Sequence, residues 1–331
     1  STLSSSSAAS DVYKRQHIGV AMTDRKKITL PVLRNRKKNN KKISWITAYD
    51  FATASFAEEA GIDMILVGDS GGMTMMGKPS TISVTMEEMI MFTSSVLRGI
   101  KTCFVVADMP FMSYQVSDEE AVRNAGRLMA LGSDAVKLEG GKEMAPRIKA
   151  IADAGIPVVS HLGLTPQSLS QLGGYRVQGR SLSSFKNLLN DILSVEDAGA
   201  AFHLLECVPE EVTAEIYKHV KNPLYGIGSG RNVDGQLVIS HDMLGLFVGD
   251  VDPKFVKKYA VNVSLGCLLG IFLLEQLSSK ILENKGLLKT SCSRLSIAGT
   301  DLDKSFMIII DTIMVLPVSY THLTLPTKRI V

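Results

Sequence analysis

Short apolar segments rich in β-branched residues alternate with longer segments of helical pattern from Lys42 to Phe247. Eight short segments predict strands, at 43–50, 63–69, 102–108, 134–139, 157–162, 201–206, 223–228 and 241–247. The segments between them predict helices, at 51–60, 85–98, 118–131, 142–154, 184–198 and 210–220. Strands that alternate with helices form a parallel sheet covered by helices. Eight such units, with no GxGxxG at the first helix, favour an α/β fold of the closed (β/α)8 TIM-barrel type over an open doubly wound sheet.

A basic segment precedes the first predicted strand. Six Lys and Arg residues lie between Arg34 and Lys42, and the whole chain has a net charge of +3. A short basic run is more typical of a solvated face or loop than of a nucleic-acid site, so we expect no nucleic-acid partner. We expect a single catalytic domain over residues 17–285 that includes this basic segment.

The chain carries no sign of a membrane or an oxidising compartment. Its longest uncharged apolar run, Ala260 to Leu274, is shorter than the ~20 residues that a bilayer crossing requires. Its four cysteines are far apart and form no CxxC pair. We expect a cytoplasmic protein that does not bind membranes.

Both ends of the chain have unusual sequences. The segments DVYKRQ (11–16) and VSYTH (318–322) can be encoded by one DNA element read in opposite orientations, as in a sequencing-library adapter. We therefore expect residues 1–16 and 318–331 to be adapter-derived and to take no part in the fold. Residues 286–317 are interpreted as an extension whose origin the sequence does not identify.

A charged or polar residue ends one predicted strand after another. These residues are Asp69, Asp108, Glu139, His161 and Glu206. The carboxyl ends of the strands of a (β/α)8 barrel meet at one mouth, where active sites are built. We expect these five side chains to lie close together.

The types of these residues indicate a metal site for a hard cation. Lys137 and Glu139 are two residues apart on one strand and therefore point into the barrel together, which is costly unless the charges are paired or bind a metal. The carboxylates of Asp69, Asp108 and Glu139, with no thiolate among them, suit Mg²⁺. Two alternatives stay open: each acid could cap the helix that follows it, and His161 could be a hydrogen-bonded core residue.

Eight motifs identify a family. They are ITAYD (46–50), VGDS (67–70), ADMPFMSY (107–114), VKLEGG (136–141), HLGLTPQS (161–168), GGYRVQGR (173–180), LLECVP (204–209) and GIGSG (226–230). Together, from about Ile28 to Tyr259, they resemble the ketopantoate hydroxymethyltransferase family. The order and spacing of HLGLTPQS and GGYRVQGR make this resemblance specific.

The resemblance implies a (β/α)8 barrel that uses Mg²⁺ and 5,10-methylenetetrahydrofolate to hydroxymethylate 3-methyl-2-oxobutanoate in pantothenate synthesis. It also implies a basic N-terminal helix before the first strand, and a cytoplasmic homo-oligomer, a decamer in this family. The site residues that it implies are Asp69 and Asp108 as metal ligands with Glu139 beside them, Ser70 on the substrate carboxylate, and Glu206 as the base that removes the C3 proton. Lys137 and His161 would contact substrate oxygens, and Asp69, Asp108 and Lys137 would also contact the bound substrate.

The sequence departs from the family pattern at three places. Phe92 stands where the family has a His, Arg176 replaces a usual Lys, and residues 261–274 are uncharged where a charged last helix is expected. The third departure puts the closure of the barrel and the oligomer interface in question. Two alternative readings follow: an Mg²⁺-dependent lyase or mutase of the phosphoenolpyruvate and α-keto acid barrel class, or a mis-joined, non-functional chain with an incomplete barrel.

Overall fold

The computed structural model describes residues 25–247 and 255–259. The chain divides into two units, Ser1–Leu268 and Leu269–Val331, and every described residue lies in the first. The predicted adapter segments, the extension at 286–317 and the apolar segment 261–274 all lie outside the described residues. What the sequence predicts for these segments therefore stays a prediction.

Eight parallel strands close into a barrel in the order β1 to β8, which confirms the predicted fold class. The strands are β1 (Ile43–Thr47), β2 (Met64–Val67), β3 (Phe104–Asp108), β4 (Ala135–Glu139), β5 (Val158–Gly163), β6 (Phe202–Glu206), β7 (Leu224–Ile227) and β8 (Gly235–Val238). Strand β8 pairs with both β7 and β1, so the barrel is complete within the described residues. Closure therefore contradicts the reading of an incomplete barrel.

The eighth strand was predicted in the wrong place. Residues 241–247 form no strand; α11 (Ser240–Met243) lies there instead, and β8 begins at Gly235. The strand was missed because the residues around Gly235 are mostly polar. A Cβ atom at this glycine would lie 2.3 Å from the carbonyl oxygen of Ile43. Glycine thus permits the close pairing of β8 with β1 that closes the barrel.

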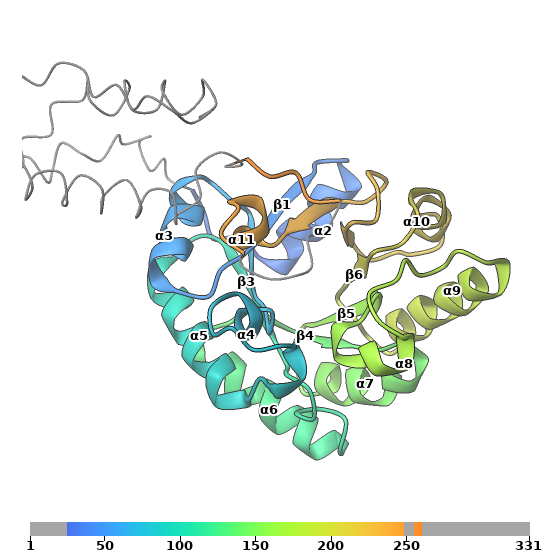
Figure 1. Ribbon diagram of the computed structural model, residues 1–331, viewed down its shortest axis with the longest axis horizontal. Helices are drawn as coiled ribbons and strands as arrows, with labels where there is room; N and C mark the ends of the chain where they lie inside the picture. Colours follow the sequence, from blue (N-terminus) through green and yellow to red (C-terminus); the bar gives the residue numbers. More distant parts are fainter. Residues whose placement is uncertain (1–24, 248–254, 260–331) are drawn as a thin grey trace, which may run out of the picture. The chain divides into compact units, whose positions relative to one another are not determined.

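Helices surround the strands (Figure 1). They are α2 (Leu30–Lys38), α3 (Phe51–Glu59), α4 (Gly71–Thr74), α5 (Met86–Gly99), α6 (Asp118–Leu131), α7 (Ala145–Asp153), α8 (Leu169–Leu172), α9 (Leu182–Asp197), α10 (Glu210–Tyr217) and α11, with 3₁₀ turns η1 (Thr81–Ser83), η2 (Lys142–Met144) and η3 (Pro166–Ser168). Local sequence fixes several ends: Thr85 and Glu88 form a capping box on α5, and Gly132 ends α6 with a left-handed φ of 112°. No helix in the described part of the chain is long and apolar enough to span a membrane.

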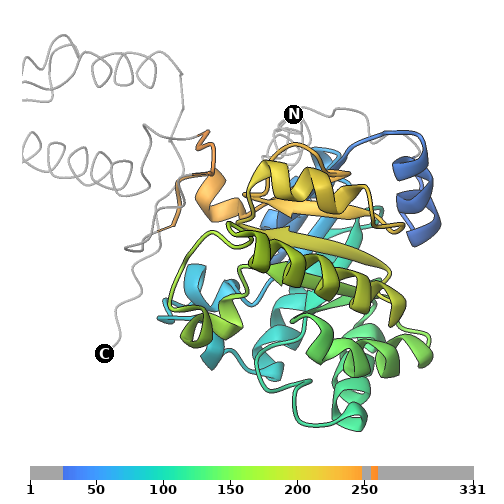
Figure 2. The ribbon, with the colours of Figure 1, turned by 90° about the vertical axis from the view of Figure 1, so that its right-hand side faces the viewer.

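The amino-terminal end of the barrel is filled by aromatic side chains and covered by the predicted basic helix. Trp45, Phe104, Phe202 and Tyr225 point inward from four strands and pack edge to face, with ring centroids 5.5–6.1 Å apart. Helix α2 covers this end, and Figure 2 shows it at one end of the barrel with α11 towards the other. Its basic side chains pair with acids just before the strands, in the ion pairs Arg36–Asp63 (2.8 Å) and Lys37–Asp234 (3.0 Å).

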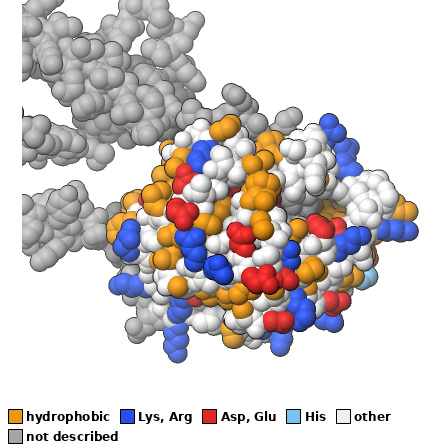
Figure 3. All heavy atoms as spheres, turned by 90° about the horizontal axis from the view of Figure 1, so that it is seen from below, with side chains coloured by type: hydrophobic (Ala, Val, Ile, Leu, Met, Phe, Trp, Pro, Cys, Tyr) orange, Lys and Arg blue, Asp and Glu red, His pale blue; other side chains and the backbone are white. Residues whose placement is uncertain are grey.

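The outer surface has mixed charge where Figure 3 shows it. Lys and Arg side chains alternate there with Asp and Glu, on the side that carries α6 and α7. Two ion pairs on this side are Arg147–Asp118 and Lys149–Asp153. This face thus offers no extended region of a single charge.

Candidate active site

Strand register brings the predicted residues together at the carboxyl end of the barrel. Asp108 on β3 lies beside Lys137 on β4, and Glu139 on β4 lies beside His161 on β5. Glu206 ends β6, level with Gly163 on β5. Asp69, predicted at the end of a strand, lies two residues beyond the end of β2 and faces the same cavity. The prediction that these side chains meet at one mouth is confirmed.

Asp69 and Asp108 form a buried pair of acids. Their residues are 4% and 1% exposed, and the Asp69 backbone N–H donates a hydrogen bond of 3.0 Å to Asp108 Oδ2. Burial, together with the negative charge of Asp108, raises the pKa of Asp69 to about 8. Burial raises the pKa of Asp108 as well. Burial therefore makes both acids harder to ionise, and the charge of Asp108 adds to this effect at Asp69. A bound cation would relieve this cost.

Lys137 is the positive charge next to this pair. Its Nζ lies 3.2 Å from Asp108 Oδ1 and 3.9 Å from Glu139 Oε1. Burial lowers the pKa of Lys137, but the carboxylates of Asp108, Glu139 and Asp69 outweigh burial and raise it. Lys137 is thus a fixed cation inside the barrel.

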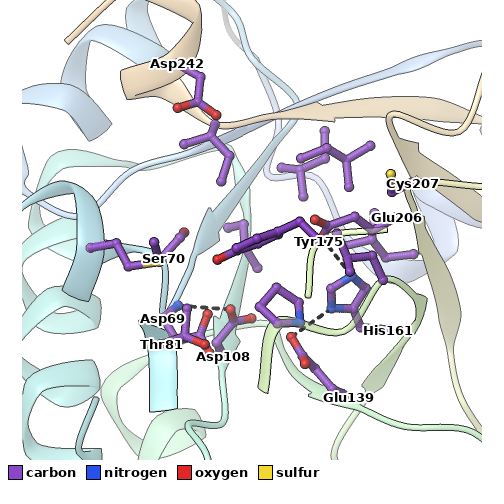
Figure 4. Close-up of a pocket in the computed structure, with 18 of the residues that line it drawn as sticks. Asp69, Ser70, Thr81, Asp108, Glu139, His161, Tyr175, Glu206, Cys207 and Asp242 are labelled. Atoms are coloured by element: carbon purple, nitrogen blue, oxygen red, sulfur yellow. Dashed lines mark hydrogen bonds and ion pairs between the residues drawn. The ribbon is translucent and has the colours of Figure 1, made fainter. Parts of the chain in front are cut away.

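His161 links two carboxylates. Its Nδ1 lies 3.1 Å from Glu139 Oε1, and its Nε2 lies 3.2 Å from Glu206 Oε2 (Figure 4). Burial and Lys137 lower the pKa of His161, whereas Glu139 and Glu206 raise it, and the result is a pKa of about 9. A protonated imidazole therefore holds the Glu206 carboxylate at the edge of the cavity.

Two buried residues that the sequence analysis did not single out complete the network. Gln167 donates from its side chain to Asp69 Oδ2 and from its backbone to Glu139 Oε2, both at 2.9 Å. Tyr114 OH donates a hydrogen bond of 2.6 Å to Gln167 Oε1. Both residues stand inside motifs quoted above, HLGLTPQS and ADMPFMSY, and these motifs were the only sequence signal for them.

Ser70 lies at the other side of the cavity from His161. Its Oγ is 2.8 Å from the hydroxyl of the buried residue Tyr49. Tyr49 is the tyrosine of the ITAYD motif. The predicted carboxylate-binding serine is thus held in place by a second hydroxyl group.

A cavity of about 400 Å³ lies at the mouth of the barrel. Its polar lining includes Asp69, Ser70, Asp108, Lys137, Glu139, His161 and Glu206, and its apolar lining includes Leu66, Met73, Leu164, Val177, Leu204, Ile227 and Phe255. Figure 4 shows Tyr175, from the loop between α8 and α9, reaching across it. The volume and the mixed lining suit a small acid with an apolar tail together with part of a larger ligand.

Comparison with known proteins identifies the family of the chain. Residues 27–265 match the family model described as "Ketopantoate hydroxymethyltransferase". The chain belongs to the ketopantoate hydroxymethyltransferase family. The 3-methyl-2-oxobutanoate hydroxymethyltransferase of Thermoanaerobacter pseudethanolicus is 53% identical over 235 residues, which cover 71% of this chain and 85% of that protein. The enzyme of the same name from Alkaliphilus metalliredigens is 54% identical over 236 residues, or 71% and 83% of the two chains.

Solved structures resemble the chain in fold alone. A phosphonopyruvate hydrolase in complex with oxalate and Mg²⁺ aligns with a TM-score of 0.53 at 13% identity, over 87% of this chain and 97% of that one. A putative phosphonomutase from Burkholderia cenocepacia aligns with a TM-score of 0.54 at 12% identity, over 66% and 95%. At such low identity these structures support only the barrel fold. The family match favours the transferase over the lyase or mutase reading.

Two of the three departures of this ketopantoate hydroxymethyltransferase family member lie at described residues, Phe92 and Arg176. Phe92, on α5, is buried and packs against the Tyr49 ring, with centroids 6.1 Å apart and planes at 64°. Arg176 lies in the loop that carries Tyr175. Neither Phe92 nor Arg176 is among the described residues that line the cavity. These two departures therefore change none of the predicted site residues, although Phe92 packs against the ring of Tyr49.

The donors at the mouth fit a Mg²⁺ ion held by two carboxylates. No group of three His, Cys, Asp or Glu residues in the described ranges is arranged as a ready metal cluster. Asp108 Oδ1 is buried and accepts no well-aligned hydrogen bond, although Lys137 lies near it. The oxygens of Glu139, by contrast, already contact His161 and Gln167. Mg²⁺ commonly binds one or two protein carboxylates and completes its octahedron with water and substrate oxygens, as the Asp69–Asp108 pair would allow.

Proposed function

We propose that the protein transfers a hydroxymethyl group from 5,10-methylenetetrahydrofolate to 3-methyl-2-oxobutanoate, which gives ketopantoate for pantothenate and coenzyme A synthesis. Membership of the family supports this activity. The observation that carries it is the arrangement of one cavity, with the Asp69–Asp108 pair on one side and Glu206, held by His161, on the other. Such a cavity can hold the two oxygens of an α-keto acid at one side and its C3 hydrogen at the other.

Asp69 and Asp108 would hold the Mg²⁺ ion, with Glu139 beside it. When bound, Mg²⁺ supplies Lewis-acid stabilisation of the negative charge that develops on the keto acid. Lys137 adds a positive charge that is fixed before substrate binds, so it stabilises the same charge without reorganisation. We propose that Glu139 acts mainly by holding His161 and Gln167, because its oxygens contact both.

Glu206 would remove the C3 proton of the keto acid as a general base. The His161 imidazolium, 3.2 Å away, holds this carboxylate in position and also lies close enough to contact a substrate oxygen. The resulting carbon nucleophile forms a bond to the one-carbon unit of the folate, and the bonds of that unit to the folate nitrogens break. Water supplies the hydroxyl group of the product and a proton to the folate nitrogen, so that tetrahydrofolate is the leaving group. Ser70, oriented by Tyr49, would bind the substrate carboxylate.

Mg²⁺ and 5,10-methylenetetrahydrofolate are thus the proposed cofactor and co-substrate, and no nucleic acid or membrane takes part. A cytoplasmic location and a homo-oligomeric state, a decamer as in the family, are proposed from the family resemblance alone. Size-exclusion chromatography with light scattering tests the oligomer.

The activity itself is tested with the full chain, purified and shown by a cooperative melt to be folded. We expect ketopantoate to form only when 3-methyl-2-oxobutanoate, 5,10-methylenetetrahydrofolate and Mg²⁺ are all present, with mass spectrometry as the readout. A folded sample that makes no ketopantoate would overturn the proposal. Folate-independent cleavage of a carbon–carbon bond in an α-keto acid would favour the lyase alternative instead.

A further inference from the structure

Thr81 is a buried polar residue in the cavity that the proposed mechanism does not use. It begins the 3₁₀ turn η1, between α4 and α5, and is 3% exposed. It lines the cavity together with Asp69 and Ser70. Its hydroxyl oxygen is buried and has no hydrogen-bond partner.

A buried hydroxyl group without a partner destabilises a folded protein, because water no longer solvates it. Valine has nearly the same shape and would avoid this loss. Two other threonines in the described part of the chain, Thr93 and Thr213, also have buried hydroxyl groups without partners. They lie on α5 and α10 and do not line the cavity, whereas Thr81 does.

The surroundings of Thr81 indicate the kind of group that would complete its hydrogen bonding. Figure 4 shows Thr81 beside Asp69, on the side of the cavity that carries Ser70 and away from His161 and Glu206. The Ser70 hydroxyl already contacts Tyr49, so one serine alone offers few donors to a carboxylate, which can accept about four hydrogen bonds. A second hydroxyl donor on this side would help to hold an anion close to the acids Asp69 and Asp108.

We infer that Thr81 is a substrate-binding residue whose hydroxyl group donates a hydrogen bond to the carboxylate of the α-keto acid, next to Ser70. This contact fixes the carboxylate at the Ser70 side, so that the C3 hydrogen points across the cavity towards Glu206. The inference rests on the proposed function for the identity of the acid. The hydroxyl side chain itself, on the cavity wall and without a protein partner, is a property of the fold.

The test compares Thr81→Val, which removes the hydroxyl group and keeps the shape, with Thr81→Ser, which keeps the hydroxyl group. We expect Thr81→Val to raise the KM for 3-methyl-2-oxobutanoate roughly 10-fold or more, as for the loss of a hydrogen bond to a charged group. The KM for the folate stays within about two-fold, and Thr81→Ser restores most of the affinity. Thr93→Val and Thr213→Val are the matched controls, with unchanged KM for both substrates.

Thermal melts provide a readout that does not depend on turnover. Without substrate, Thr81→Val melts at the same temperature as the wild type or higher, because it removes an unpaired polar group. Added 3-methyl-2-oxobutanoate with Mg²⁺ raises the melting temperature of the wild type and of Thr81→Ser, and raises that of Thr81→Val much less.

Three outcomes would overturn the inference. They are an unchanged keto acid KM in Thr81→Val, a rise in the folate KM instead, and a lower melting temperature of Thr81→Val with normal kinetics, which would mark a structural hydroxyl group. A wild type that binds the keto acid but forms no ketopantoate would refute the proposed function alone. The melts would then still decide the role of Thr81.

Discussion

The two ends of the barrel are built on the same strands but have opposite chemistry. On β3, Phe104 packs in the aromatic cluster at the closed end, and Asp108, four residues later, faces the cavity. On β6, Phe202 and Glu206 repeat this relation. Side chains with the same inward direction thus stabilise the barrel at one end and provide the reactive groups at the other.

The two ends of the barrel also differ in what they contribute to the stability of the fold. The aromatic end buries large apolar rings and pairs its charges with α2, so it contributes stability. The mouth instead buries two neighbouring acids whose pKa values are raised, mainly by burial. Burial of these acids lowers stability but prepares the site for its ligands. Substitutions at the two ends are therefore expected to separate activity from stability.

The largest effect on activity is expected for Asp108→Asn. This change keeps the shape of the side chain but removes a proposed metal ligand and the partner of Lys137, so we expect kcat/KM to fall by about 10³-fold or more. The melting temperature without Mg²⁺ should change little, since the loss of one of two adjacent buried acids offsets the loss of the Lys137 ion pair. A clear loss of stability would mean that the mouth also holds the barrel together, contrary to the comparison.

Trp45→Ala is the counterpart at the closed end. Loss of a fully buried ring that packs on Phe202 and Tyr225 leaves a cavity, and we expect the free energy of unfolding to fall by about 3–5 kcal/mol. Urea unfolding followed by circular dichroism measures this. The remaining folded protein should keep its kcat, and a loss of kcat in a sample shown to be folded would break the comparison.

The ion pairs between α2 and the amino-terminal end of the barrel are expected to contribute less to stability than the aromatic side chains. Lys37→Met removes the charged partner of Asp234, which still accepts hydrogen bonds from Tyr217 and from the backbone of Leu224. We therefore expect the free energy of unfolding, measured by urea unfolding, to fall by about 1 kcal/mol. Lys149→Met, which breaks an exposed ion pair on α7, is the control. Equal losses in the two variants would show that cover of the barrel end by α2 adds no stability.

The smallest effect is expected from a histidine on the outer face of the barrel wall. His203 is buried between Ser160 and Glu196, and burial lowers its pKa below the usual 6.5 although Glu196 opposes this. The unfolded chain then takes up the proton first, so stability is retained above pH 6.5 and is lost as the pH falls below it. Melting temperatures between pH 5 and pH 7.5 measure this slope, and it should be shallower in His203→Gln. An equal slope in the variant would assign the acid sensitivity to other groups.

Seven of the eight strands were predictable because β-branched and apolar residues form short continuous runs in a sheet that is buried on both faces. The eighth was not, because β8 contains a glycine and a glutamine and depends on its pairing with β1. The acids, Lys137 and His161 could be found because charge is rare inside such strands. Gln167 could not, since it lies in the short 3₁₀ turn η3 and contacts Asp69, 98 positions away in the chain.

The central claim is that the two sides of the cavity act together, one stabilising charge on the keto acid and the other removing its C3 proton. Proton NMR in D₂O, with Mg²⁺ and without folate, measures the exchange of the C3 hydrogen of 3-methyl-2-oxobutanoate directly. The wild type should catalyse this exchange, and Glu206→Gln should slow it by about 10²–10⁴-fold while the substrate still raises the melting temperature. Exchange at the wild-type rate in Glu206→Gln would contradict the account.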